Sequence, residues 1–451
     1  MSRYLADYRR IIALGCPILV SQLGMIVVGF ADNSMVGHYS TDALSAASFV
    51  NNVFNLAVLG CLGFTYGLTP LIGALFTIAD NHGIGTMLRD GLRLNVIYAL
   101  LLTAAMAVVY AFLPNLGQPE HLLPLIRPYF LLYLAGVLPI AIFNVFAQAA
   151  YALNSTKMPM WIILASNCIN IFGNWVLIYG NLGVPEMGLT GAGVSTLVAR
   201  WFCPVIIYLV FMRGVRYSGY KSAFKSARFS IDRRRKIFTT SLPVSLQLML
   251  ETGSFSIAAV MAGWLGAVEL AAFQIILITG TLGFCVYYSF GSATSVLVAN
   301  AAGAKDNMRM RQVATAGYHV TLVLCLISSA IFYFAGRFLF AIFTDDRVVL
   351  DLTITLIPPL MLYQIADATQ INYSSALRGT GNVMPMLLTA FVSYAVVGVP
   401  ATYILTFTFC GGMPGLVSSF SISLFCAAVM YFIYFMRTTR SLSHGINQKS
   451  V

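Results

Sequence analysis

The sequence predicts an all-α integral membrane protein with twelve transmembrane helices, arranged as two six-helix bundles related by pseudo-two-fold symmetry. Three observations predict it: the composition, the number of long apolar segments, and a repeat between the two halves of the chain. Of the 451 residues, 59% are hydrophobic and 9% are charged, and the mean hydropathy is +0.83. A soluble core cannot hide that much apolar surface, so most of the chain is expected to lie in a bilayer.

Twelve segments are long and apolar enough to cross a membrane, because a helical span needs about 20 apolar residues. The short basic segment that precedes the first of them has no cleavage site at signal-peptide distance, so no cleavable signal is expected. The expected spans are Leu14–Gly37, Ala46–Leu75, Gly91–Leu113, Pro128–Leu153, Met158–Gly180, Gly188–Met212, Thr239–Gly263, Val268–Val298, Ala314–Ile342, Leu352–Leu377, Met384–Phe407 and Gly412–Met436.

The net charge of +11 is explained by membrane topology, and no nucleic-acid partner is expected. If the N-terminus is cytoplasmic, all but four of the 26 Lys and Arg fall on the cytoplasmic side, with Arg127, Arg337 and Arg347 at the opposite face and Arg200 inside a span. This asymmetry places both termini of a twelve-span chain in the cytoplasm. The densest basic run, residues 213–236, carries nine bases and favours contact with lipid headgroups. We therefore expect a multi-pass protein of the cell inner membrane, in contact with the lipid bilayer.

The two halves of the chain repeat each other. Residues 16–37 align with residues 242–263 at a constant offset of 226, and Pro17 matches Pro243. The segment ALNSTKMPM recurs as ALRGTGNVMPM, in each case after the fourth span of its half. Six spans per half with the same loop polarity indicate a parallel repeat. The expected domains are an N-terminal bundle (1–212), a basic cytoplasmic linker (213–238), a C-terminal bundle (239–437) and a cytoplasmic tail (438–451).

Three of the fifteen acidic residues lie well inside spans: Asp32, Glu251 and Asp367. The other twelve are expected in loops, tails or span ends, where water and headgroups solvate them. A carboxylate at the centre of a span costs about 2.5 to 3.5 kcal/mol, so each of the three should face the bundle interior or a wet cavity. Such a group either coordinates a hard cation such as Na⁺ or takes up a proton. Glu251 and Asp367, with Tyr363 on the same helix face as Asp367, are the candidate cation-coupling residues.

Further polar residues share helix faces with these acids, because positions three or four apart lie on one side of a helix. For the amides, simple interhelical hydrogen bonding is an equally good reading. Aromatic residues make up 13% of the chain and supply faces for organic cations. The candidates for substrate or proton handling are Asp32, Asn174, Asn170, Gln22, Gln274 and Tyr288.

Arg200 leaves three interpretations open. It pairs with Asp32 across the first bundle, extends its side chain toward the cytoplasm, or marks a misplaced span boundary. A pairing would make Asp32 a structural counter-ion, whereas an unpaired Asp32 is available for substrate or protons. Both roles for Asp32 are retained.

Other functional classes find little support. None of the five His forms an HExxH or paired-ligand pattern, and the eight Cys lack CxxC spacing. No enzyme is therefore expected, and no metal site beyond a transient Na⁺ at Glu251 and Asp367. A continuous channel is disfavoured by the repeat and its off-axis acids.

The chain resembles the multidrug and toxic compound extrusion (MATE) family of transporters over essentially its full length. The resemblance is carried by GFADNSMVGHYSTDALSAAS around Asp32, GNWVLIYG around Asn174, LPVSLQLMLETGSF around Glu251, LAAFQI around Gln274 and YQIADATQINYSSALRGTGN around Asp367. The acid of the seventh span together with the YQxxDA motif of the tenth resembles the NorM-type branch. That resemblance implies Na⁺ coupling at Glu251, Tyr363 and Asp367, and drug or proton handling at Asp32. Asn174 stands where some relatives have aspartate, which weakens proton coupling by a pair of acids there.

The repeat, the embedded acids and the resemblance together imply a secondary active antiporter that works by alternating access. It would export amphipathic, cationic small molecules in exchange for Na⁺ or H⁺, with no other cofactor, and the resemblance implies a monomer. A lipid or lipid-linked oligosaccharide flippase of the same superfamily is the alternative. Such a flippase should carry a more cationic central cavity for phosphate groups, whereas the embedded charge here is mainly acidic.

Overall fold

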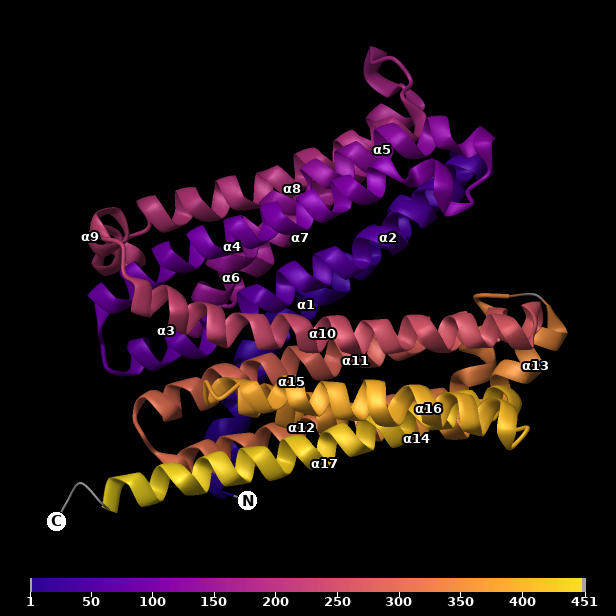
Figure 1. Cartoon of the computed structure of the whole chain (residues 1–451). Coiled ribbons are helices and arrows are strands. Elements are labelled where there is room, and N and C mark those ends of the chain that lie inside the picture. Colours follow the sequence, from indigo (N-terminus) through magenta and orange to yellow (C-terminus); the bar gives the residue numbers. More distant parts are fainter. Residues whose placement is uncertain (1, 345, 448–451) are drawn as a thin grey trace. The chain divides into compact units, whose positions relative to one another are not determined.

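A computed structural model describes residues 2–344 and 346–447, and within these ranges all regular secondary structure is helical (Figure 1). Among the described residues, 11 helices are long and apolar enough to cross a membrane, or up to 12 if the bent pair Arg347–Thr355 and Ile357–Gly379 is one span. The all-α, multi-pass fold expected from the sequence is confirmed. The last residues of the expected cytoplasmic tail, 448–451, lie outside the described residues.

The first half of the chain runs from α1 to α9, with short 3-10 turns between some of the helices. The helices are α1 (Ser2–Tyr39), α2 (Thr41–Tyr66), α3 (Leu68–Thr77), α4 (Asn81–Ala111), α5 (Leu123–Ala135), α6 (Val137–Ala152), α7 (Lys157–Tyr179), α8 (Gly188–Arg213) and α9 (Ser218–Ser226), and the 3-10 turns are η1 (Leu113–Leu116), η2 (Glu120–Leu122), η3 (Asn181–Gly183) and η4 (Val215–Tyr217).

The second half follows the same order with two π-helical segments in its fifth span. It contains α10 (Ile231–Leu265), α11 (Ala267–Gly303), α12 (Asn307–Ala341), α13 (Arg347–Thr355), α14 (Ile357–Gly379), α15 (Met384–Ala390), the π-helical η5 (Phe391–Gly398), α16 (Val399–Tyr403), the π-helical η6 (Ile404–Thr408) and α17 (Gly412–Asn447).

Equivalent turns in the two halves confirm the repeat at the level of the backbone. Asp80 begins α4 by accepting a hydrogen bond from the Gly83 N–H at 2.7 Å, and Asp306 begins α12 by accepting one from the Arg309 N–H at 2.8 Å. The residue before each cap has a positive φ, 55° and 56° respectively. L-residues other than glycine rarely adopt this conformation. Its recurrence at an offset of 226 residues shows that the two halves share one turn as well as one helix order.

Contacts between residues divide the chain into two compact units. The boundaries between the units fall inside helices α1 and α10. One unit holds Val20–Ser245, and the other holds the residues up to Leu19 together with those from Leu246 onward. The bundle boundaries expected from the sequence are residue 212, near the end of α8, and residue 239, inside α10, whereas the contact boundaries follow Leu19 in α1 and Ser245 in α10. The difference arises because the first turns of α1 and α10 pack with the opposite half of the chain.

A buried carboxylate holds the first turns of each of these helices. In the unit that contains Leu246 onward, Asp7 of α1 is 1% exposed, pairs with the Arg309 guanidinium and accepts a hydrogen bond from Gln312 Nε2 at 2.8 Å. In the unit Val20–Ser245, Asp90 of α4 is fully buried and pairs with Arg233 Nε of α10 at 2.7 Å. The expectation that all acids outside the three central ones are solvated is wrong for Asp7 and Asp90, because guanidinium groups replace water around them.

Each unit has its own apolar core. Phe54 and Phe130 lie in the core of the unit Val20–Ser245, and Phe273 and Phe420 lie in the core of the other. Because lipid is as apolar as these side chains, the helices are held together by close packing and by interhelical hydrogen bonds.

Candidate functional site

The structure brings Glu251 of α10 and Asp367 of α14 together inside the unit that contains residues 246–447. Their side chains are 8% and 2% exposed, and the two carboxylates lie within electrostatic range of each other. The expectation that these two acids face the bundle interior holds for both. Two like charges in a poorly hydrated site repel each other, so this arrangement favours uptake of a positive charge.

A chain of hydrogen bonds orients Glu251. Gln247, one turn earlier on α10, donates from Nε2 to Glu251 Oε2 at 3.3 Å. The Tyr394 hydroxyl, from η5, also donates to Glu251, and it accepts a hydrogen bond from Gln370 Nε2 of α14 at 3.0 Å. The direction of donation is fixed throughout, because a carboxylate only accepts. Gln370 is thereby held with its amide nitrogen toward Tyr394.

Three buried oxygen atoms on α14 are left without a hydrogen bond in the described part of the chain: Asp367 Oδ2, Gln370 Oε1 and Asn372 Oδ1. The first two lie three residues apart on one face of the helix. Buried polar atoms are normally satisfied, so unpaired acceptors beside a second carboxylate need an explanation. Both are oxygen atoms, the ligand type that hard cations prefer. The donor set therefore fits Na⁺, and one of the carboxylates alone fits a proton.

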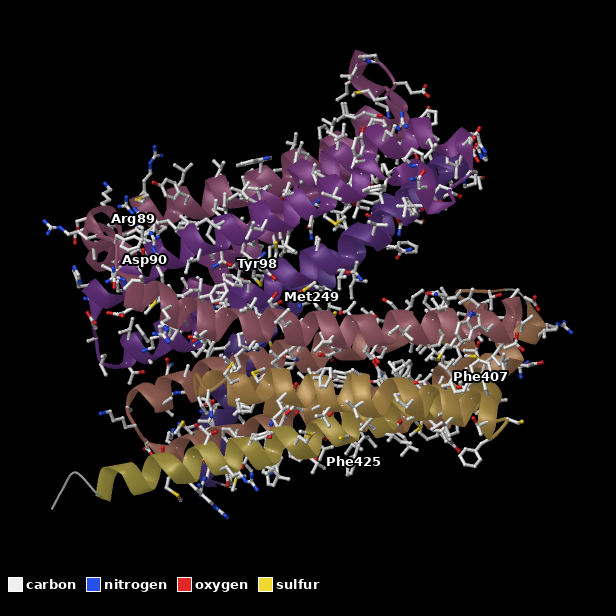
Figure 2. All side chains as sticks on the ribbon, viewed as in Figure 1. Arg89, Asp90, Tyr98, Met249, Phe407 and Phe425 are labelled. Carbon is white, nitrogen blue, oxygen red and sulfur yellow. The ribbon has the colours of Figure 1, made fainter. Side chains whose placement is uncertain are left out.

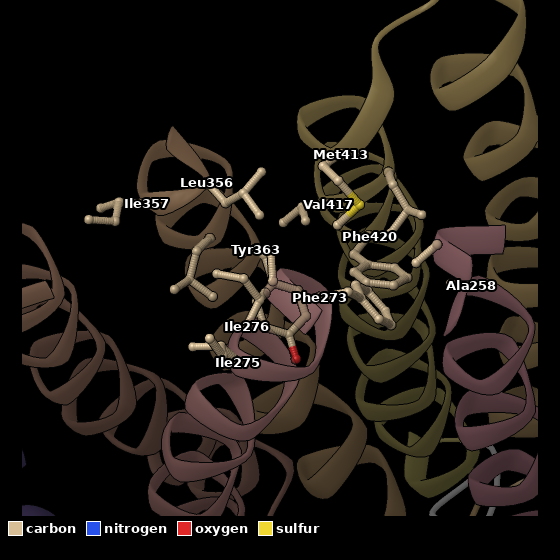
Figure 3. Packing of buried hydrophobic residues seen from close by; sticks show 14 of the residues in the cluster. Ala258, Phe273, Ile275, Ile276, Leu356, Ile357, Tyr363, Met413, Val417 and Phe420 are labelled. Carbon is tan, nitrogen blue, oxygen red and sulfur yellow. The ribbon is translucent and has the colours of Figure 1, made fainter. Parts of the chain in front are cut away.

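Tyr363 lies one helical turn before Asp367 and forms one wall of this site. Figure 3 shows its ring among the buried apolar residues of the cluster, and its edge contacts Phe255 with ring centroids 6.4 Å apart. Tyr363 lies within electrostatic range of both Asp367 and Glu251. Its ring thus closes the apolar side of the site.

The other half of the chain holds a separate polar cluster around Asp32 of α1. Asn174 Nδ2 of α7 donates to Asp32 Oδ1 at 2.5 Å, and Asn174 is fully buried while Asp32 is half-buried. Asn170 Oδ1 accepts from Asn174 Nδ2 at 3.5 Å, and Asn170 Nδ2 donates to Thr196 Oγ1 of α8 at 3.1 Å. The amide ladder thus links α1, α7 and α8, with the carboxylate at its exposed end.

Arg200 lies near the middle of α8, which extends more than ten residues to either side. The interpretation of a misplaced span boundary is therefore wrong. Its guanidinium carbon stands 4.3 Å from the centroid of the Tyr133 ring, a cation–π contact, and Arg200 lies within electrostatic range of Asp32. Among the described residues no ion pair within 4.0 Å joins Arg200 to Asp32. The structure therefore does not form the direct pair that would make Asp32 a structural counter-ion.

The remaining predicted residues lie outside both clusters. Gln22 is half-buried on α1, and Gln274 is exposed on α11. Tyr288, also on α11, is half-buried and stacks on Phe284 with centroids 5.7 Å apart. Gln274, Thr281 and Tyr288 follow one face of α11 at seven-residue spacing. Their role in substrate handling stays a prediction.

The chain is similar to known proteins over both of its halves. The family described as MatE matches residues 17–176 and 243–404, one stretch in each half. A probable multidrug resistance protein NorM of Photorhabdus laumondii is 29% identical over 89% of this chain and 88% of that protein. A protein of the same name from Bradyrhizobium diazoefficiens is 29% identical over 97% of this chain and 95% of that protein.

The chain belongs to the MATE family of transporters and is NorM-like. Solved structures share its fold: a eukaryotic MATE transporter matches with a TM-score of 0.86 at 20% identity, covering 98% of this chain and 99% of that one. A transporter of the MOP superfamily from Pyrococcus furiosus matches with a TM-score of 0.88 at 18% identity, covering 97% of each chain.

Sequence reasoning missed one residue of the site in this MATE transporter. Tyr394 joins Gln370 to Glu251, yet it was not among the predicted residues. It lies in η5, where a π-helical turn shifts side chains off the ordinary helical period. A search for polar groups at intervals of three or four therefore cannot find it. The signal that remains is a Tyr near the middle of a span that Pro400 interrupts.

Proposed function

We propose that this MATE transporter is a secondary active antiporter that exports amphipathic, cationic small molecules in exchange for Na⁺ or H⁺. It would act as a monomer in the cell inner membrane, with both termini in the cytoplasm, by alternating access between the two faces of the membrane. The observation that carries the coupling half of the proposal is the unpaired Asp367 Oδ2 beside a second buried carboxylate. Without a counter-charge this site is electrostatically unfavourable.

In the proposed cycle the coupling ion enters the site of Glu251 and Asp367 from the outside. Asp367 Oδ2, a Glu251 oxygen and Gln370 Oε1 would supply oxygen ligands, while Gln247 and Tyr394 hold Glu251 in place. A cation neutralises the repulsion between the carboxylates and so stabilises whichever conformation keeps the site closed. A ligand shifts a conformational equilibrium only by its difference in affinity for the two states, and a doubly acidic site makes that difference large.

The Asp32 cluster is the proposed site for the exported compound or for a proton. Asp32 is half-buried and its carboxylate can attract a cationic group. Asn174 is hydrogen bonded to Asp32 through a neutral amide. An acid at this position would add a second negative charge to the site. The first half therefore carries one central negative charge and the second half two.

The test is export of a fluorescent organic cation from proteoliposomes under an imposed Na⁺ gradient and, separately, an imposed proton gradient. Asp367→Asn keeps the shape of the side chain and removes its charge, so gradient-driven export should fall to the level of liposomes without protein. The matched control is Asp351→Asn, which removes an exposed carboxylate from α13 in the same unit and should keep at least half of the export rate.

The two gradients separate the outcomes. Na⁺-driven export that is lost in Asp367→Asn supports Na⁺ coupling at this site, and proton-driven export lost in the same variant supports the antiporter with H⁺ as the ion. Undiminished export by a well-folded Asp367→Asn protein would reject the coupling role. Failure of the wild type to export any dye of a panel, combined with movement of a labelled lipid between leaflets, would replace the antiporter by the flippase.

A further inference from the structure

A cavity of about 330 Å³ lies among α4, α8 and α9, within the unit Val20–Ser245 and apart from both polar clusters. Three basic side chains line it: Arg89 and Arg93 of α4 and Lys225 of α9. Figure 2 shows Arg89 at the end of α4 that lies beside α9, next to Asp90. The cavity therefore stands at the end of the unit that carries the dense basic run of residues 213–236.

The charge around the cavity is strongly positive even after the nearby ion pairs are taken into account. Asp90 faces three guanidinium groups: Arg233 Nε at 2.7 Å, Arg234 Nε at 3.3 Å and Arg93 NH1 at 3.6 Å. One carboxylate cannot neutralise three arginines. Arg93, the most distant of the three, is 37% exposed and keeps its charge available to a ligand in the cavity.

Arg89 builds the cavity as well as lining it. Its NH1 donates to the carbonyl oxygen of Phe224 at 2.7 Å and to the carbonyl oxygen of Lys225, which are at the C-terminal end of α9. A cation there also complements the negative end of the helix dipole. Arg89 thus holds α9 against α4 and places the Lys225 side chain at the rim of the cavity.

The remaining wall is apolar. Leu92 of α4, Tyr208 and Met212 of α8 and Phe224 of α9 complete the lining. Tyr208 is 42% exposed and Phe224 is buried, so the apolar wall runs from the surface into the unit. A small inorganic anion would leave this wall uncovered, whereas a molecule with a charged head and an apolar tail would contact both halves of the lining.

The depth of the cavity matches the headgroup region of a bilayer. Helix α4 has 31 residues, more than the roughly 20 that cross the hydrocarbon, so its first turns extend beyond it. Tyr208 and Met212 stand near the C-terminal end of α8, at Arg213, and an exposed tyrosine at such a position is typical of the membrane interface. The basic side chains that line the cavity therefore lie at the depth expected for lipid phosphate groups.

We propose that this cavity is a binding site for one anionic phospholipid. The headgroup phosphate contacts Arg93 and Lys225, and an acyl chain lies along Leu92, Tyr208 and Met212. Basic pockets between membrane helices on the cytoplasmic side bind anionic headgroups in this way, and on the proposed orientation this end of the unit is cytoplasmic. The site is independent of the exported compound and of the coupling ion.

The test is native mass spectrometry of the full chain released from membranes of mixed phosphatidylglycerol and phosphatidylcholine with the same acyl chains. The wild type should retain one phosphatidylglycerol. In Arg93→Gln/Lys225→Gln the apparent affinity should fall roughly 30-fold, about fivefold for each base removed. In this variant the buried carboxylate of Asp90 still pairs with Arg233 and Arg234, so it does not lose its counter-ions. Lys225→Gln by itself, at an exposed side chain, should lower the affinity about fivefold.

The matched control is Arg235→Gln/Lys236→Gln, which removes two exposed bases from the same end of the unit without touching the cavity lining. It should retain the lipid as the wild type does. Equal loss in the control and the cavity variant would assign the retention to general surface charge and overturn the proposal. Retention of phosphatidylglycerol by Arg93→Gln/Lys225→Gln, or displacement of the lipid by millimolar glycerol phosphate, would overturn it as well.

Discussion

Tyr394 and Gln370 decide how Glu251 can act. The tyrosine hydroxyl has one proton, which it donates to Glu251, so the amide nitrogen of Gln370 must point toward the tyrosine. The amide oxygen of Gln370 is then left without a donor on the same helix face as Asp367 Oδ2. The direction of this one hydrogen bond therefore leaves two unpaired oxygen atoms, Gln370 Oε1 and Asp367 Oδ2, on the same face of α14, which is the arrangement that the proposed cation site needs.

Asn174 has a comparable influence in the first half, where it donates the 2.5 Å hydrogen bond to Asp32. Asn174→Ala removes this donor and leaves the carboxylate free to rotate. We expect the initial rate of dye export to fall about tenfold, the effect of losing one hydrogen bond to a charged group. The measurement is gradient-driven export at equal protein density in proteoliposomes.

The control for this variant is Asn181→Ala, which removes an amide that donates to the Trp175 carbonyl oxygen at 2.8 Å in an exposed turn. Its export rate should stay within about twofold of the wild type. If Asn174→Ala also exports at the wild-type rate, Asp32 does not depend on the amide ladder and its orientation has another source.

At the scale of elements, α1 and α10 are the two helices that belong to both compact units. The first turns of each helix are held by a carboxylate–guanidinium pair, but the two helices supply opposite partners. Helix α1 supplies the carboxylate of Asp7, and α10 supplies the guanidinium groups of Arg233 and Arg234. The repeat conserves the geometry of the turns and helices while exchanging the sign of the charges. Each first turn is thereby anchored by a buried charge pair.

Asp7→Asn tests this anchoring. Loss of the charge weakens the contact with Arg309 and leaves that guanidinium, which is one-third exposed, without its counter-ion. We expect the free energy of unfolding to fall by about 2 kcal/mol, which is within the range for hydrogen bonds to charged groups, and the melting temperature in detergent to fall with it. Thermal unfolding followed by circular dichroism measures both.

Asp42→Asn is the comparison for Asp7→Asn, because Asp42 is 61% exposed and stands 3.9 Å from His121. An exposed pair of this kind contributes about 0 to 1 kcal/mol, so this variant should melt within a degree or two of the wild type. Equal melting temperatures for the two variants would show that the buried pair at Asp7 adds no more stability than a surface contact.

At the scale of the whole molecule, two halves of common architecture carry unequal chemistry. Near the middle of its spans the second half holds two buried carboxylates in electrostatic range, and the first half holds the half-buried Asp32, which is bonded to an amide. This division of charge supports the proposal that one half binds the coupling ion and the other meets the transported compound. The proposed orientation of the whole chain in the membrane sets which way that exchange runs.

Single cysteines introduced after replacement of the eight native ones test the orientation. Arg347→Cys, at the exposed start of α13, should react with a membrane-impermeant maleimide added to right-side-out vesicles, whereas the exposed Arg235→Cys should react only in inverted vesicles. This result is expected because bases accumulate on the cytoplasmic side. Labelling of Arg235→Cys from outside would reverse the proposed topology and with it the direction of transport.

The sequence by itself determined the class of fold, the repeat and the identity of the central acids, because each of these depends on composition or on short-range periodicity. An apolar span, a proline at a matched position and an acid inside a span are visible without knowing which helices touch. The proximity of Glu251 and Asp367 could also be predicted from the sequence. Two acids in apolar spans of the same half both have to face the interior of one bundle.

Only the tertiary structure decided what those acids contact. Tyr394 reaches Glu251 through a π-helical segment that breaks the ordinary helical phase, and Arg200 stacks on Tyr133 without forming a close ion pair with Asp32. Asp7 and Asp90 likewise resemble solvated acids in sequence but are buried against arginines far away in the chain. These outcomes depend on contacts between helices, and the free energy of a buried charge is set by its neighbours in space.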